Sequence, residues 1–415
     1  MKPFVGISIL FVGLFLISGA AFSDQAQLYG RVYLFDGEEI EGYIRWDKNE
    51  GFWDDILDGN KELDRKTKRK YGRRDDDEDR RGREISIFGV TIYSEHDNVI
   101  WKFGNEAQSG IRMGHIEELI PTGDDEVTLL LKSGIEIELS EGSGDIGTEN
   151  REILVEDSYE GVMELYWDDI DHIKFLASPG YESNFGKRLY GTVTTRRGDE
   201  YTGYICWDMD EIFDADILDG KEGRRNREIE FSNIKTIERR SSNSSIVTLK
   251  NGKEIRLSDS NDIDSGNRGI TVSDLNLGRI KIYWDEFDMI EFSDPPEGPS
   301  YNSFDGGRKI QGSVLTEEGE KFTGEIKWDL DEEYTWEILD GNYYDIEFDI
   351  EFAFIKSIEK TSYHSSRVTL KDGRSFKLRD SNDIDGENKG ILIITADKDE
   401  ILIDWDEFDM VEFTH

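Results

Sequence analysis

Oxygen-bearing side chains crowd one short segment that occurs twice in the sequence. Calcium takes about six to eight oxygen ligands, and short acidic loops can supply them. The spacing differs from an EF-hand loop, because Ile263 stands in the third ligand position and no glutamate closes the loop. Two hypotheses stay open: a pair of calcium-binding loops, or loops whose side chains cap backbone amides. The candidate metal ligands are Asp259, Asn261, Asp262, Asp264 and Asn267, copied as Asp380, Asn382, Asp383, Asp385 and Asn388.

A second group of carboxylates precedes each of these loops. Paired carboxylates can act as acid and base in a glycosidase. An active site is usually built once, whereas this group occurs in more than one part of the chain. We therefore expect it to bind a cation or a partner, or to form a solvated acidic rim. Its members are Asp208, Asp210, Glu211, Asp214, Asp216 and Asp219, copied as Asp329, Asp331, Glu332, Glu333, Glu337 and Asp340.

Motifs for other chemistry do not occur in the sequence. The five histidines share no metal-binding spacing, and no Gly-x-Ser-x-Gly, phosphate-binding loop or dinucleotide fingerprint is present. We predict no catalytic residue, and calcium is the one candidate cofactor. The sequence thus favours a protein that is not an enzyme.

Composition restricts the class of partner. Lys plus Arg is 50 and Asp plus Glu is 92, so the net charge is 50 − 92 = −42. Nucleic-acid binding needs a basic face, so this charge argues against a nucleic-acid partner. The hydrophobic content of 36% is low, but an aromatic content of 12% is too high for a solvated coil. A folded, acidic protein is expected.

The N-terminus resembles a secretory signal peptide, predicted at 1–23. Lys2 supplies the positive charge, Phe4–Ile17 is apolar, and Ala21-Phe22-Ser23 forms a small-x-small cleavage site. The apolar run is short for a spanning helix, so no stable membrane insertion is expected after cleavage, although an uncleaved anchor stays open. With one cysteine, Cys206, the chain cannot form an intramolecular disulfide. We expect a secreted or periplasmic protein of a bacterial envelope, with Cys206 as a partly exposed thiol.

Sequence matches at a constant offset of 121 residues indicate that the chain contains tandem repeats. Trp207-Asp208 recurs as Trp328-Asp329, and Leu218-Asp219-Gly220 as Leu339-Asp340-Gly341. A more divergent copy opens the mature chain. Aromatic residues in the linkers favour a semi-rigid rod or arc. The predicted organisation is repeat 1 at 24–176 with a charged insertion at 61–108, a linker at 177–188, repeat 2 at 189–293, a Pro/Gly linker at 294–309 and repeat 3 at 310–415.

Each repeat is itself double. The spacing Ile229, Phe231, Ile234, Ile237 returns as Ile282, Trp284, Phe287, Ile290, and it suits a strand, a tight 3₁₀ turn and a second strand. A hairpin pattern precedes each such unit. The pattern resembles SH3-like and Sm-like small β-barrels, which implies an all-β fold of three tandem repeats with two small-barrel halves each. Sm-like proteins bind RNA, which the acidity opposes, whereas SH3-like barrels more often bind proteins or serve as structural modules.

The sequence therefore predicts an exported, non-enzymatic β-repeat protein. It would act as a binding or structural module in the cell envelope or outside the cell, with a protein or an envelope polymer as partner. Repetition of a weak surface would give avidity without a deep pocket. The alternative is a hydrolase that acts on envelope polymers through an acidic groove.

Overall fold

The structure is a computed structural model that describes residues 25–62, 85–87, 90–93, 106–140 and 144–415. The predicted signal peptide and most of the charged insertion lie outside the described residues. The prediction of an all-β protein is confirmed: the described strands form two large antiparallel sheets and one small hairpin. The described helices are short, and none of them has the length and apolar character needed to cross a membrane.

The first repeat forms a ten-stranded sheet with the order β11-β10-β2-β1-β12-β7-β8-β9-β3-β6. Apolar residues alternate along its strands, as in β8, so one face of the sheet is buried. A separate hairpin joins β4 (Ile85–Ile87) to β5 (Val90–Tyr93). The strands of the large sheet are β1 (Tyr29–Leu34), β2 (Glu39–Trp46), β3 (Ile56–Glu62), β6 (Glu106–Arg112), β7 (Ile116–Pro121), β8 (Glu126–Leu131), β9 (Glu136–Ser140), β10 (Ile153–Asp157), β11 (Gly161–Leu165) and β12 (Ile170–Phe175).

The second repeat has the same strand order, from β21 at one edge to β16 at the other. Equivalent residues therefore build equivalent strands, as the offset predicts. Its strands are β13 (Tyr190–Thr195), β14 (Glu200–Cys206), β15 (Ile217–Glu222), β16 (Arg225–Glu230), β17 (Ile234–Ser241), β18 (Ser244–Leu249), β19 (Glu254–Ser258), β20 (Ile270–Asp274), β21 (Gly278–Ile282) and β22 (Phe287–Phe292).

The third repeat copies this order from β31 to β26, and β26 pairs with β21 of the second repeat. Repeats 2 and 3 therefore share one twenty-stranded sheet. Its strands are β23 (Gln311–Thr316), β24 (Lys321–Lys327), β25 (Ile338–Tyr343), β26 (Ile346–Glu351), β27 (Ile355–Ser362), β28 (Ser365–Leu370), β29 (Ser375–Arg379), β30 (Ile391–Ile394), β31 (Glu400–Ile403) and β32 (Phe408–Phe413).

The expectation of closed small-barrel halves is not confirmed. In each repeat the chain of pairings runs across both halves and leaves two sheet edges, so the sheets do not close. The predicted 3₁₀ turns do occur between consecutive strands in several halves. They are η1 (Met113–His115), η2 (Trp167–Asp169), η3 (Phe231–Asn233) and η6 (Phe352–Phe354), with η4 (Asn261–Ile263) and η5 (Tyr301–Ser303) elsewhere.

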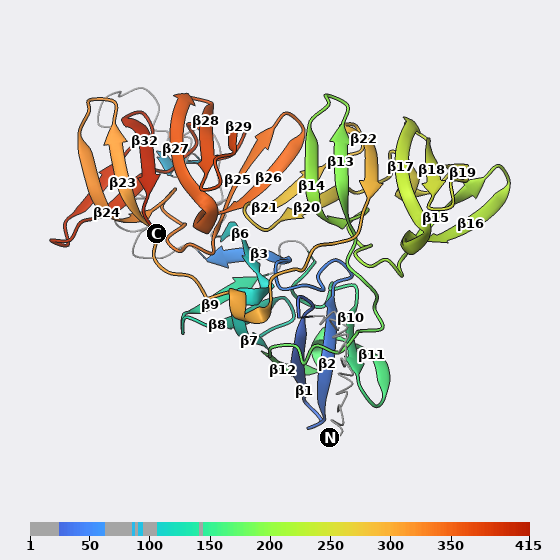
Figure 1. Cartoon of the computed structure of the whole chain (residues 1–415). Coiled ribbons are helices and arrows are strands. Elements are labelled where there is room, and N and C mark those ends of the chain that lie inside the picture. The colour runs from blue at the N-terminus through green and yellow to red at the C-terminus, as the bar shows by residue number, and fades with distance from the viewer. Residues whose placement is uncertain (1–24, 63–84, 88–89, 94–105, 141–143) are drawn as a thin grey trace, which may run out of the picture.

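The repeats are arranged as a triangle, not as the predicted rod or arc (Figure 1). The first repeat contacts both others: Arg45 pairs with Asp216 of the second, and Lys61 pairs with Glu337 of the third. The linkers do pack against a repeat, as their aromatic residues suggest. The Tyr301 ring lies 4.6 Å from that of Trp53. A rod is excluded because the second linker runs back across the first repeat.

Candidate cation sites

A tight turn ends the second strand of each repeat and carries an acidic pair. In the first repeat, Trp46 and Glu50 exchange backbone hydrogen bonds of 2.7 and 3.0 Å across this turn. Asp47 and Lys48 have φ values of 42° and 73°, in the left-handed region that L residues rarely occupy. The same conformation occurs at Asp208 and Asp329. The turn directs one aspartate and one glutamate toward the acidic loop of the same repeat.

One aspartate of each acidic loop turns inward to meet this turn. The buried tryptophans fix its position, because Nε1 of Trp46, Trp207 and Trp328 each donates a 2.8 Å hydrogen bond to its carbonyl oxygen. Its carboxylate accepts a backbone N–H from the third strand of the repeat, at 2.6 to 2.9 Å. The inward aspartates are Asp145, Asp262 and Asp383.

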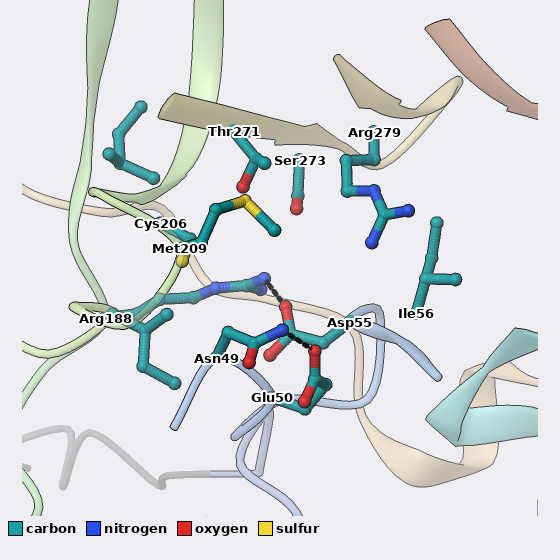
Figure 2. A pocket seen from close by; sticks show the side chains of 12 residues that line it. Asn49, Glu50, Asp55, Ile56, Arg188, Cys206, Met209, Thr271, Ser273 and Arg279 are labelled. Atoms are coloured by element: carbon teal, nitrogen blue, oxygen red, sulfur yellow. Dashed lines mark hydrogen bonds and ion pairs between the residues drawn. The ribbon is translucent and has the colours of Figure 1, made fainter. Parts of the chain in front are cut away.

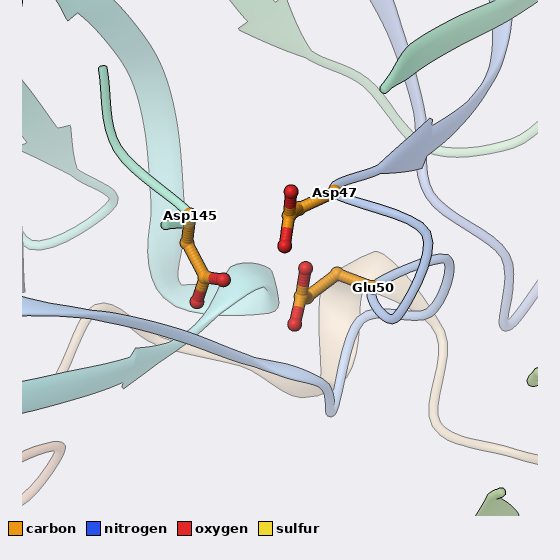
Figure 3. A group of neighbouring side chains, drawn as sticks. All are labelled: Asp47, Glu50 and Asp145. Carbon is orange, nitrogen blue, oxygen red and sulfur yellow. The ribbon is translucent and has the colours of Figure 1, made fainter. Parts of the chain in front are cut away.

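In the first repeat these elements bring three carboxylates together. One oxygen from each of Asp47, Glu50 and Asp145 lies within 4.8 Å of the others. The exposed fractions of the three residues are 3%, 2% and 3%. Figure 3 shows the three groups facing a common point from two segments far apart in the sequence. We call this set the first-repeat triad.

Burial and mutual repulsion raise the pKa values of Glu50 and Asp145. Desolvation, followed by the negative charges of Asp145 and Asp47, holds the pKa of Glu50 well above its usual range. Desolvation and then Asp58 raise the pKa of Asp145 to about 8. One positive charge lies beside the triad, because Arg151 Nη2 is 2.8 Å from Asp47 Oδ2. The triad therefore retains a proton or attracts a cation at neutral pH.

The other repeats contain equivalent acids beside cations of their own. Desolvation raises the pKa of Glu211 to about 11, and that of Asp262 to about 7. Arg268 bonds both Asp208 and Asp210, at 2.9 and 2.5 Å. In the third repeat, Lys389 Nζ lies 2.7 Å from Asp329 and 3.1 Å from Asp331. Each of these cations compensates part of the acidic charge of its repeat.

The loop residues predicted as calcium ligands bond to different partners within the protein and do not converge on one point. Asp264 and Asn267 accept the backbone N–H groups of Gly266 and Gly269, at 2.8 and 3.0 Å. Asp385 and Asn388 do the same in the third repeat. Asn261 and Asn382 donate to Asp208 and Asp329, whereas Asp259 and Asp380 are exposed beside Lys221 and Arg379. Among the predicted carboxylate ligands, only Asp262 and Asp383 face the carboxylates of the turn.

Two members of the second acidic group, Asp216 and Glu337, join the repeats together with Asp55. One carboxylate per repeat caps two backbone N–H groups of its own turn and also pairs with a cation of another repeat. Arg45 Nη1 lies 2.7 Å from Asp216 in this way. The three carboxylates are Asp55, Asp216 and Glu337, and their partners are Arg188, Arg45 and Lys61.

Cys206 is buried, not partly exposed as the strand alternation predicts. Its outward face is covered because the first repeat packs there, and it forms a small cluster with Phe52, Ile212 and Phe213. Burial raises the pKa of the thiol well above its usual range. A cavity of about 20 Å³ lies beside Cys206, Glu50 and Arg188, at the boundary between the first and second repeats (Figure 2).

The sequence contains a signal for the triad that loop composition alone misses. The pattern Trp-Asp-x-x-Glu occurs at 46–50, 207–211 and 328–332. An Asp-Ile pair then follows in each acidic loop, at 145–146, 262–263 and 383–384. Taken together, the two patterns place the glutamate of the turn beside the inward aspartate. This glutamate is absent from the predicted ligand set.

No family model, curated protein or solved structure matches this chain.

Proposed function

We propose that the protein is an exported, non-enzymatic β-repeat protein that acts as a binding or structural module in the cell envelope or outside the cell. Three tandem repeats, each with two SH3-like halves, would form one body with a partner-binding edge. The signal-like segment at 1–23 supports export. The observation that carries the binding role is the open edge strand β11 in the first repeat.

Among the described strands, β11 pairs only with β10, whereas its equivalent β21 also pairs with β26. An unpaired edge presents a row of backbone donors and acceptors that an extended segment can complete. Large apolar side chains surround this edge. The exposed fractions are 95% for Tyr159, 50% for Val162 and 66% for Tyr166. An extended protein segment that adds a strand to β11 is the partner these features support.

The buried acids support a non-catalytic role. Carboxyl groups with raised pKa values occur in all three repeats, whereas a hydrolase would place them in one cleft. The cavity beside Glu50, about 20 Å³, has room for about one water molecule and none for a sugar ring.

Capture of envelope proteins by the immobilised mature chain tests this role. Val162→Lys places a charge on the open edge and should abolish capture, because it blocks strand addition. Ile217→Lys is the matched control, since Ile217 is a similarly exposed aliphatic residue of the second repeat. Equal capture by both variants would contradict binding at β11.

The intact mass of the protein from its native host tests export, with a mature start near Asp24 expected.

A further inference from the structure

We propose that the first-repeat triad, Asp47, Glu50 and Asp145, is the binding site of one divalent cation, with calcium favoured. This goes beyond the proposed function, which requires no bound ion. The ligands come from the turn after β2 and from the loop before β10, so the ion would hold the two segments together.

The charge of the triad is incompletely balanced. Arg151 pairs with Asp47 and Arg279 acts on Asp145, whereas Glu50 has no ion-pair partner among the described residues. A buried carboxylate without a compensating charge is costly, so a further positive charge beside Glu50 is favoured when it is ionised. A divalent cation supplies the missing charge at one point.

An unpartnered oxygen points to the same conclusion. Glu50 is 98% buried, since its exposed fraction is 2%, and its Oε2 atom has no hydrogen-bond partner among the described residues. Its other oxygen accepts a hydrogen bond from Asn49. Buried polar atoms in folded proteins are normally satisfied, so a free carboxylate oxygen within an acidic triad indicates a missing partner.

The donor set selects the class of ion. All three ligands are carboxylate oxygens, which suit hard cations such as calcium, magnesium and manganese. Oxygens bound to calcium lie about 2.4 Å from the ion. The three carboxylates of the triad lie near enough to one another to share one such ion. Magnesium has a smaller shell and demands near-octahedral geometry. The cavity that Glu50 also lines is large enough for about one water molecule.

The third repeat provides a matched comparison. Its equivalent glutamate, Glu332, also has an unpartnered buried oxygen. There, however, Lys61 Nζ lies 3.9 Å from Glu332, and Lys389 bonds Asp329. Two ammonium groups already supply the positive charge, so the third repeat should bind calcium much more weakly than the first.

The test is calcium titration of the EDTA-treated mature chain by calorimetry, with magnesium titrated separately. Melting temperatures in calcium chloride and sodium chloride at matched ionic strength provide a second readout. We expect calcium to bind and to raise the melting temperature beyond the sodium control. Glu50→Gln should weaken calcium binding at least tenfold, whereas Glu332→Gln should leave it unchanged.

The double variant Asp264→Asn/Asp385→Asn separates the triad from the acidic loops, and we expect it to bind calcium normally. Loss of calcium binding in this double variant but not in Glu50→Gln would assign the ion to the loops and overturn the proposal. Equal melting temperatures and no heat of binding would show that the triad holds protons. Circular dichroism checks the folding of each variant, and Asp47→Asn replaces Glu50→Gln if the latter fails to fold. Partner capture is not involved, so the result is independent of the proposed function.

Discussion

Gly278 of β21 lies so close to Asp349 of β26 that a Cβ atom on the glycine would be 2.0 Å from the Asp349 carbonyl oxygen. The φ of Gly278 is 144°, which also disfavours an L side chain. This contact lies in the pairing that joins the second and third repeats into one sheet. The shared sheet therefore depends on the absence of a side chain at one position.

We expect Gly278→Ala to destabilise the protein by more than about 2 kcal/mol, because the strands must separate to accommodate the methyl group. Urea unfolding measures the change. Gly198→Asn is the control, since a Cβ atom there meets nothing within 4 Å and asparagine tolerates a positive φ. Equal stability of Gly278→Ala and the parent would show that the two repeats do not share this pairing in solution.

The two edge strands of the twenty-stranded sheet, β31 and β16, cannot pair between molecules in the way that β21 pairs with β26. Asp399 and Glu400 stand 121 residues after Gly278 and Arg279, and Glu228 of β16 stands 121 residues before Asp349. If β31 of one chain paired with β16 of another, the Asp399 side chain would stand where Gly278 has none. The carboxylates of Glu400 and Glu228 would also meet where Arg279 and Asp349 form an ion pair. We expect no head-to-tail polymer from these edges. The double variant Asp399→Gly/Glu400→Arg should self-associate at high concentration in sedimentation velocity, whereas the single Glu400→Gln variant should not.

Arg188 connects the first two repeats through a buried network. It pairs with Asp54 at 2.5 Å and with Asp55, and its guanidinium lies 4.3 Å from the centre of the Phe52 ring. Arg188→Met should cost about 3–5 kcal/mol of stability, because it leaves two carboxylates buried without a cation.

Arg227→Met is the control for Arg188, because Arg227 and Glu222 form a surface pair and their loss should cost less than about 1 kcal/mol. Adding Asp54→Asn to Arg188→Met should recover part of the loss. Urea unfolding of the three variants measures these differences. A cost for Arg188→Met no larger than that of Arg227→Met would contradict a buried network.

Much of the fold can be predicted from the sequence because it depends on local periodicity. The step from Ile229 to Phe231 to Ile234 specifies a strand, a 3₁₀ turn and another strand, and η3 lies there. The pairing of β21 with β26 depends instead on Gly278 and on two strands far apart in the chain. Such tertiary contacts leave no periodic signal in the sequence. The same is true of the contacts of the first repeat with the second and third, which give a triangle where the sequence predicts a rod or arc.

The candidate site was predicted in part for a similar reason. A dense run of Asp and Asn residues marks the loops, and Asp262 and Asp383 do face the carboxylates of their turns. Composition cannot show that Asp264 caps its own turn while Asp262 points inward. That difference arises from the hydrogen bond between the buried Trp207 and the Asp262 carbonyl, which requires the folded core.

The metal-free protein should become less stable as the pH rises from 5 to 8. Burial raises the pKa of Asp262 to about 7 and those of Asp145 and Asp329 to about 8, whereas unfolded aspartate titrates near pH 4. Between these values the folded state binds more protons than the unfolded state, so the free energy of unfolding falls with rising pH. Most carboxylates in folded proteins give the opposite slope.

Urea unfolding in EDTA at pH 5, 6, 7 and 8 and constant ionic strength measures this slope. Ordinary surface carboxylates do not contribute, because they are already ionised at pH 5 in both states. Asp145→Asn should flatten the slope, since it removes one of the protons that the folded state retains. Asp399→Asn, at the free edge of the sheet, should leave the slope unchanged. A stability that is constant or rises from pH 5 to pH 8 would show that the buried acids are ionised and compensated in the folded protein.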